Sequence, residues 1–155
     1  MLNSLAEHPN IVGTKLSCGS IGKLHRLTTS HPSTSFAVFA GQSQWALPGL
    51  FCGSAGVIAA TVNLFPKLHT RLYRLWKEGK VDEAMKIQET LGHADWAVIK
   101  LGGVTGLKRA VSEFFGYGSS AVRGPLTAAP AEKLLGKEGE LLKRVLEMEN
   151  ALVLG

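Results

Sequence analysis

The sequence has little from which a disulfide framework, a metal site or a membrane span could be built. Its 155 residues include two cysteines, Cys18 and Cys52, which lie far apart and form no C-x-x-C pair. This spacing predicts reduced thiols rather than a metal site. The five histidines include no pair at four-residue spacing with an acidic ligand nearby, so no metal and no cofactor are expected. No apolar run approaches the roughly 18 residues of a membrane-spanning helix.

The charge balance is mild. The formal net charge is +5, and the basic residues are spread along the chain. This pattern disfavours nucleic acid and membrane surfaces as partners. The first ten residues, MLNSLAEHPN, have no basic n-region and no long apolar run, so no secretory signal is predicted. We therefore expect a cytoplasmic protein, with mitochondrial location as the alternative.

The first half of the chain alternates between strand and helix patterns. "NIVGTKL", "FAVFAG" and "AGVIAAT" are short and apolar without polar alternation, which is typical of parallel strands covered on both faces. Helices are predicted between them, with Ser20 and Ser43 as N-caps, and after them, where Asn63 opens a helix that stops near Gly79. The fold class is therefore predicted to be α/β, as an open layer or a barrel.

The second half carries no strand signal. Helices are predicted over "VDEAMKIQETL", "ADWAVIKLGGVTGLKRAVSEFF" and "APAEKLLGKEGELLKRVLEMENALVL". Between the last two lies "GYGSSAVRGPL", interpreted as a rigid connection whose arginine, Arg123, pairs with a carboxylate or, alternatively, as an anion-binding loop. The chain thus divides into a strand-bearing segment, residues 1–79, and a helical region, residues 80–155.

Lys15 stands out because it lies at the carboxyl end of the first predicted strand. Ligands of α/β barrels and open α/β sheets bind at this end of the strands. A lysine beside an apolar wall there is partly desolvated, which lowers its pKa and frees the amine to attack a carbonyl. The alternative is a lysine that reaches past the strand end into water. The residue alone leaves both interpretations open.

The combination of motifs is more specific. Gly13-Thr14-Lys15 forms a G-x-K sequence, Gly41 ends the second predicted strand, Gly56-Val57-Ile58 begins the third, and Asn63–Pro66 forms N-x-x-P. Together these resemble the C-terminal half of the dihydrodipicolinate synthase / N-acetylneuraminate lyase family over about residues 8–127. "FGYGSSAVRGPL" is most similar to the branch that contains 4-hydroxy-2-oxoglutarate and 2-keto-3-deoxy sugar-acid aldolases.

The resemblance implies a fold and a chemistry. The fold is the C-terminal part of a TIM (β/α)8 barrel, about three βα units, followed by a C-terminal helical region. Lys15 is implied as the catalytic Schiff-base lysine of a class I aldolase or lyase, and Gly41, Val57 and Ile58 as substrate-binding residues. The implied substrate is a small 2-oxo acid with a pyruvate moiety. A homo-oligomer is expected.

The sequence also departs from the family. The strands one to five of the barrel, the G-T-T-G-E loop and the proton-shuttling tyrosine have no counterpart before Lys15. Leu16 stands where many members carry an acidic residue, and Gln42 replaces an aspartate of the synthase branch. Two hypotheses follow. The chain is either a class I aldolase in truncated form or a catalytically inactive fragment or paralogue that acts as an assembly module.

Overall fold

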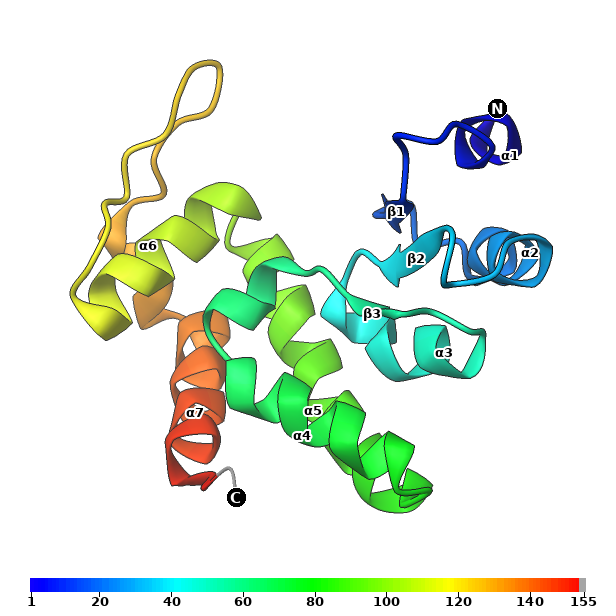
Figure 1. The fold of residues 1–155 in the computed structure, drawn as a ribbon. Helices are drawn as coiled ribbons and strands as arrows, with labels where there is room; N and C mark the ends of the chain where they lie inside the picture. The colour runs from blue at the N-terminus through cyan, green and yellow to red at the C-terminus, as the bar shows by residue number, and fades with distance from the viewer. Residues whose placement is uncertain (154–155) are drawn as a thin grey trace. The chain divides into compact units, whose positions relative to one another are not determined.

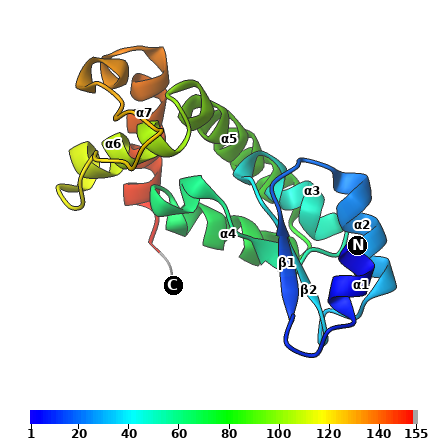
Figure 2. The same cartoon turned by 90° about the horizontal axis from the view of Figure 1, so that it is seen from above.

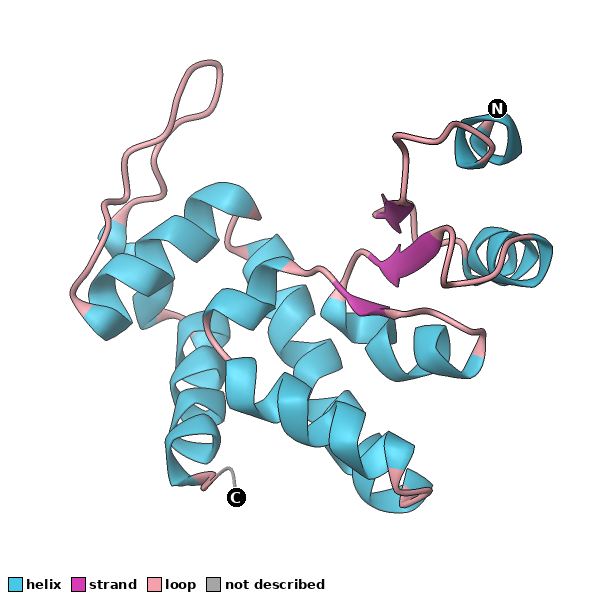
Figure 3. Ribbon diagram, in the orientation of Figure 1, coloured by secondary structure: helices cyan, strands magenta, loops and turns pink. Residues whose placement is uncertain are grey.

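A computed structural model describes residues 1–153, and the chain divides into two compact units, Met1–Ala59 and Ala60–Gly155 (Figure 1). Figure 3 shows that strands occur in the first unit, whereas the described part of the second unit contains helices and loops. The second unit begins before α4 (Pro66–Lys77), a helix that the sequence interpretation groups with residues 1–79. The division at residue 79 into a barrel segment and a C-terminal helical region stays a prediction.

The first unit is a small α/β layer. Its elements are α1 (Leu2–Ala6), β1 (Gly13–Leu16), α2 (Ile21–Ser30), β2 (Ala37–Ala40), η1 (Ser43–Trp45), α3 (Ala46–Phe51) and β3 (Gly56–Val57). The strands are parallel in the order β1-β2-β3. Helices α1, α2 and α3 lie on one side of the sheet (Figures 1 and 2). The α/β class expected from the sequence is confirmed.

The core of this unit lies between the sheet and its helices. Leu16, Val38 and Ala40 are buried on the helix side, and Leu24, Leu27 and Trp45 pack against them. Helix α2 begins at Ser20, whose hydroxyl accepts a hydrogen bond from the backbone N–H of Lys23 at 3.2 Å. This confirms the predicted N-cap. The cap satisfies one of the N–H groups that a helix start leaves without an internal partner.

Several local predictions for this unit are wrong. Ser43 is not an N-cap, because it lies within the 3₁₀ turn η1 and is fully buried, while Gln42 occupies the cap position. Strand β3 has two residues instead of the predicted seven, since a strand lasts only as long as its neighbour supplies ladder hydrogen bonds. Helix α1 was not predicted from the N-terminal sequence.

The second unit is helical. Its elements are η2 (Ala60–Asn63), α4, α5 (Val81–Lys100), α6 (Val104–Phe115), η3 (Ala131–Leu135) and α7 (Lys137–Ala151). Helix α4 buries Leu68, Leu72 and Leu75 and ends before Gly79, whose φ of +75° suits glycine. Asn63 does not open this helix. It lies in η2, and Pro66 occupies the first turn of α4.

Glycines set the other helix boundaries. Helix α5 runs unbroken through Gly92, joining two segments that the sequence interpretation separates. The helix predicted over residues 94–115 is instead broken at Gly102 and Gly103, where φ is +109° and +63°. The last predicted helix is divided at Gly136 into η3 and α7. At Gly102 and Gly103 the positive φ values interrupt the repeating backbone geometry that a helix requires, whereas at Gly136 an extended backbone with φ of −88° and ψ of −178° does so.

Two buried carboxylates tie the beginning of this unit to its later helices. Glu149 on α7 accepts hydrogen bonds from the backbone N–H groups of Lys67 and Leu68 at 2.7 and 2.8 Å. Asp95 on α5 accepts a hydrogen bond from the Thr61 hydroxyl at 3.2 Å. The segment that follows β3 in the chain is thus held by side chains from α5 and α7.

Candidate active site

Lys15 is the third residue of β1 and lies directly across from Phe39 on β2. Successive side chains of a strand point to opposite faces of the sheet. Because Leu16, Val38 and Ala40 are buried under the helices, Lys15 and Phe39 lie on the other face. The Lys15 side chain is exposed in the described chain. An apolar wall was expected around Lys15. Within the first unit, the neighbouring strand supplies only Phe39 next to it.

The register continues to the third strand. Phe39 is paired with Gly56, and a side-chain carbon at Gly56 would lie 3.7 Å from the Phe39 ring. Lys15, Phe39 and Gly56 therefore form one row across the sheet. Glycine in this row leaves the area beside the phenylalanine ring open, so the row presents an ammonium group next to an aromatic ring and bare backbone.

The other predicted site residues follow at the same edge. Gly41 comes directly after β2, Val57 ends β3 opposite Ala40, and Ile58 donates its backbone N–H to the Ala40 carbonyl at 2.9 Å. A side chain on Gly41 would overlap the backbone of Leu16, so glycine is required where the ends of β1 and β2 approach. The structure thus brings the strand ends that carry Lys15, Gly41, Val57 and Ile58 to one edge of the sheet.

Ser54 is a residue of this edge that the sequence interpretation missed. Its buried hydroxyl accepts a hydrogen bond from the backbone N–H of Ala40 at 3.1 Å and lies 2.6 Å from the Gly56 carbonyl, to which it donates. It thereby connects the end of β2 with the start of β3. A serine in a "CGSAG" loop gives no signal of its own, because serine is common in turns.

Cys18 lies just beyond the end of β1 and is exposed. The backbone N–H of Ser20, followed by the Lys23 side chain, lowers the pKa of the Cys18 thiol. The Lys23 ammonium lies 3.4 Å from the sulfur and donates to it. Hydrogen bonds and a cation near a thiol stabilise its thiolate form.

Tyrosine and carboxylate side chains are scarce in the first unit. Residues 1–59 include no tyrosine and no aspartate, and Glu7 is their only carboxylate side chain. Tyr73 and Tyr117 belong to the second unit, where both are exposed. Among residues 1–153, no group of three or more metal-ligating side chains occurs. Within the first unit, Lys15 therefore has no tyrosine or aspartate that could move a proton beside it.

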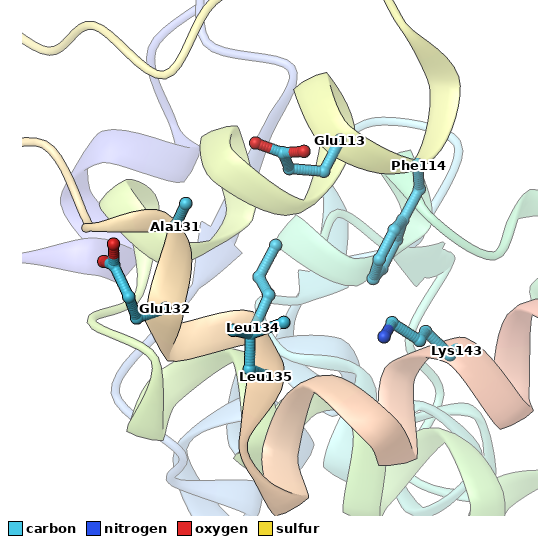
Figure 4. Close-up of a pocket in the computed structure, with 7 residues that line it drawn as sticks. All are labelled: Glu113, Phe114, Ala131, Glu132, Leu134, Leu135 and Lys143. Carbon is cyan, nitrogen blue, oxygen red and sulfur yellow. The ribbon is translucent and has the colours of Figure 1, made fainter.

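A cavity of about 310 Å³ lies elsewhere, in the second unit between α6, η3 and α7 (Figure 4). Phe114, Leu134 and Leu135 give it apolar walls, and Glu113 and Lys143 stand at its margin. It contains none of the predicted site residues. No helix within residues 1–153 is long and apolar enough to cross a membrane.

Comparison with models of protein families shows to which family the chain belongs. Residues 1–143 match the model of the dihydrodipicolinate synthetase family. The chain belongs to this family. The resemblance inferred from the G-x-K sequence and the glycine-punctuated strands is thereby confirmed.

Individual family members show which branch is similar. The chain is 39% identical over 149 residues to a protein of Emericella nidulans named as a mitochondrial 4-hydroxy-2-oxoglutarate aldolase, covering 96% of this chain and 47% of that protein. It is 32% identical to an L-threo-3-deoxy-hexylosonate aldolase of Aspergillus niger, covering 96% and 50%. The chain spans about half the length of the curated relatives it matches.

Solved structures of the family share the arrangement. A dihydrodipicolinate synthase family protein of Coccidioides immitis superposes with a TM-score of 0.79 at 34% identity, over 95% of this chain and 49% of that one. An N-acetylneuraminate lyase of Fusobacterium nucleatum gives a TM-score of 0.73 at 26% identity, over 95% and 48%.

Proposed function

We propose that this chain supplies the Schiff-base lysine, Lys15, of a class I aldolase that acts on pyruvate-derived 2-oxo acids. The position of Lys15 in a G-x-K sequence, on a parallel strand of a chain that belongs to this family, carries the proposal. The similarity to 4-hydroxy-2-oxoglutarate and 3-deoxy-hexylosonate aldolases favours cleavage of a 4-hydroxy-2-oxo acid or a 2-keto-3-deoxy sugar acid. In this proposal Gly41, Val57 and Ile58 border the substrate.

The chemistry requires the free amine of Lys15. Its Nζ adds to the C2 carbonyl of the substrate, and loss of water leaves an iminium ion. A base then takes the proton of the C4 hydroxyl, and the electrons of the C3–C4 bond move into the iminium. An aldehyde departs, and the remaining enamine accepts a proton at C3. Water finally releases pyruvate and restores the amine.

Two features make this activity depend on more polypeptide than the described units. Lys15 is exposed, whereas a lysine that titrates near neutral pH needs a dry environment. The first unit also has no tyrosine that could shuttle protons. We therefore propose that the chain forms the last three βα units and the helical extension of a TIM barrel. The preceding units would then cover Lys15 and supply the acid–base group.

The exposed lysine also favours a second candidate function. Without a covering half-barrel, the chain would be a catalytically inactive member that binds other family proteins as an assembly module. In either case we propose a homo-oligomer located in the cytoplasm or in mitochondria, the latter in line with the names of two fungal relatives.

Imine trapping tests the catalytic proposal. The chain would be fused behind the half of the Emericella nidulans relative that it does not match, treated with pyruvate and borohydride, and mapped by peptide mass spectrometry. We expect a reduced pyruvyl group on Lys15 and none on Lys23, Lys67, Lys77 or Lys100. An imine needs an unprotonated amine, which a covered site without water favours.

Two matched variants serve as controls. Lys15→Arg keeps the charge but cannot form the imine, so labelling and the release of pyruvate from 4-hydroxy-2-oxoglutarate should both disappear. Lys23→Arg, eight residues further along the chain, should leave both unchanged. Equal labelling at several lysines, or normal cleavage by Lys15→Arg, would show that Lys15 is not the Schiff-base residue. A fusion that folds but neither labels nor cleaves would support the assembly module.

A further inference from the structure

One face of α5 carries six residues that remain exposed along its whole length. At about 100° per residue, their side chains fall within an arc of about 80°. Met85 and Trp96 are 49% and 51% exposed, which is high for large apolar side chains. The remaining members are charged or titratable and are also exposed. The full face comprises Asp82, Met85, Glu89, His93, Trp96 and Lys100.

The charges on this face are arranged symmetrically about the level of Leu91. Asp82 lies nine residues before Leu91 and Lys100 nine residues after it. Glu89 lies two residues before it and His93 two residues after it. The acidic members therefore occupy the first half of the face and the basic members the second half.

This arrangement is self-complementary when two copies run antiparallel. A two-fold axis at the level of Leu91 places Asp82 opposite Lys100 of a second copy and Glu89 opposite His93. Met85 then falls at the level of Ala97, next to Trp96. In an antiparallel helix pair, residues on one flank face the same flank of the partner, so opposite charges meet along the face. A parallel pair would instead place Asp82 against Asp82 and Lys100 against Lys100.

The local surroundings suit such a partner helix. Within the described residues, neither Asp82 nor Glu89 takes part in an ion pair, and Lys100 lies 5.0 Å from the centre of the Trp96 ring without a carboxylate partner. Beside this face, a cavity of about 270 Å³ is lined by Trp96, Ala97 and Leu141, among others. The side chain of Met85 from a second copy reaches the level of this cavity and is flexible enough to fill it.

We propose that this face of α5 is a homodimer interface in which two copies pair antiparallel about the level of Leu91. The inference adds a surface to the proposed homo-oligomer and does not depend on chemistry at Lys15. The contact involves one helix per copy, which places it among small interfaces, so a dissociation constant on the order of 10–100 µM is expected.

Charge exchange tests both the surface and the direction of pairing. Sedimentation velocity over a concentration series would compare the chain with Asp82→Lys and with Lys100→Asp. Each single variant should bind itself at least about tenfold more weakly, because both ends of the pair then meet like charges. An equimolar mixture of the two variants should recover the association, since each end again pairs opposite charges. The double variant should recover it as well.

The control is Glu83→Lys. It makes the same change in net charge as Asp82→Lys on the same helix, at an exposed position well outside the face, and should leave association unchanged. Circular dichroism of every variant would check that α5 stays folded. A chain that is monomeric over the whole series contradicts the proposal. So does association that the single variants at positions 82 and 100 leave intact, which would indicate contact through the sheet edges or another surface.

Discussion

Glu149 near the end of α7 accepts a hydrogen bond of 2.8 Å from the backbone N–H of Leu68 in the first turn of α4. The two residues are 81 positions apart. The carboxylate thereby provides the cap that the sequence at the start of α4 lacks, because Phe65 at the N-cap position has no side-chain acceptor. Its charge is also favourable at the positive end of the helix dipole.

Removal of this cap should be costly. Glu149→Ala leaves two N–H groups without their acceptor, so we expect the free energy of unfolding to fall by about 2–3 kcal/mol. Glu149→Gln keeps one acceptor oxygen and should cost about 1 kcal/mol. Urea denaturation gives both values. Glu147→Ala, an exposed change on the same helix, should stay within about 0.5 kcal/mol, and a cost equal to that of Glu149→Ala would argue against the cap.

Alanine at two glycines should have opposite effects. Gly41→Ala forces a methyl group into the backbone of Leu16, and we expect a loss of about 2 kcal/mol or more together with a distorted β1–β2 edge. Gly22→Ala lies in the exposed first turns of α2, where the new carbon has room. There we expect a gain of about 0.5–1 kcal/mol. Thermal melts of both variants would reveal whether Gly41 is sterically required.

Ser54→Ala should loosen the connection between β2 and β3. The variant loses the hydroxyl that accepts from Ala40 and donates to Gly56, at an expected cost of about 1–3 kcal/mol. Hydrogen exchange provides the local measurement, because the amide protons of Ala40 and Ile58 should exchange faster. Ser35→Ala removes an exposed hydroxyl and is the matched control. Unchanged protection at Ala40 would mean that the serine does not hold this edge.

His69 should make stability depend on pH. Burial lowers the pKa of His69, although the Phe65 carbonyl, which accepts from Nδ1 at 2.7 Å, acts in the opposite direction. The unfolded chain therefore binds a proton more readily than the folded one. The stability contributed by neutral His69 is complete above the unfolded pKa of about 6.5 and declines as the pH falls below it.

Urea denaturation between pH 5 and pH 8 would measure this dependence. The unfolding free energy should rise with pH over the acidic part of this range, and His69→Gln should flatten the rise. His25→Gln changes an exposed histidine and should leave the slope as it is. If the unfolding free energy fell more steeply toward pH 8 than toward pH 5, the pH dependence could not be assigned to His69.

Much of the first unit could be predicted because its strands are short apolar segments with glycines at or near their ends. The register that places Lys15 beside Phe39 could not, since strand pairing depends on contacts between segments that are 24 residues apart. The length of β3 was overestimated for the same reason. Apolar residues such as Ile58 continue the pattern, but the ladder with β2 ends at Val57.

In the helical part, the spacing of apolar residues predicted the helices but not where they end. The sequence interpretation ends a helix before Gly92 and continues one through Gly102 and Gly103, yet α5 passes through the first and the chain breaks at the other two. The difference lies in backbone φ, which a single glycine does not reveal. The capping of α4 by Glu149 was likewise invisible, because it joins segments at opposite ends of the unit.

The in-register row of Lys15, Phe39 and Gly56 also determines where the chain tolerates an inserted or deleted residue. Loss or gain of a single codon within Ala37–Ala40 would exchange the two faces of β2, so that Phe39 would point at the helices and a core residue would take its place beside Lys15. The irregular segment 116–130 has no alternation of faces to preserve. An inserted or deleted residue there should therefore cost little stability. Insertions and deletions in natural variants should therefore accumulate in the second region and avoid the first.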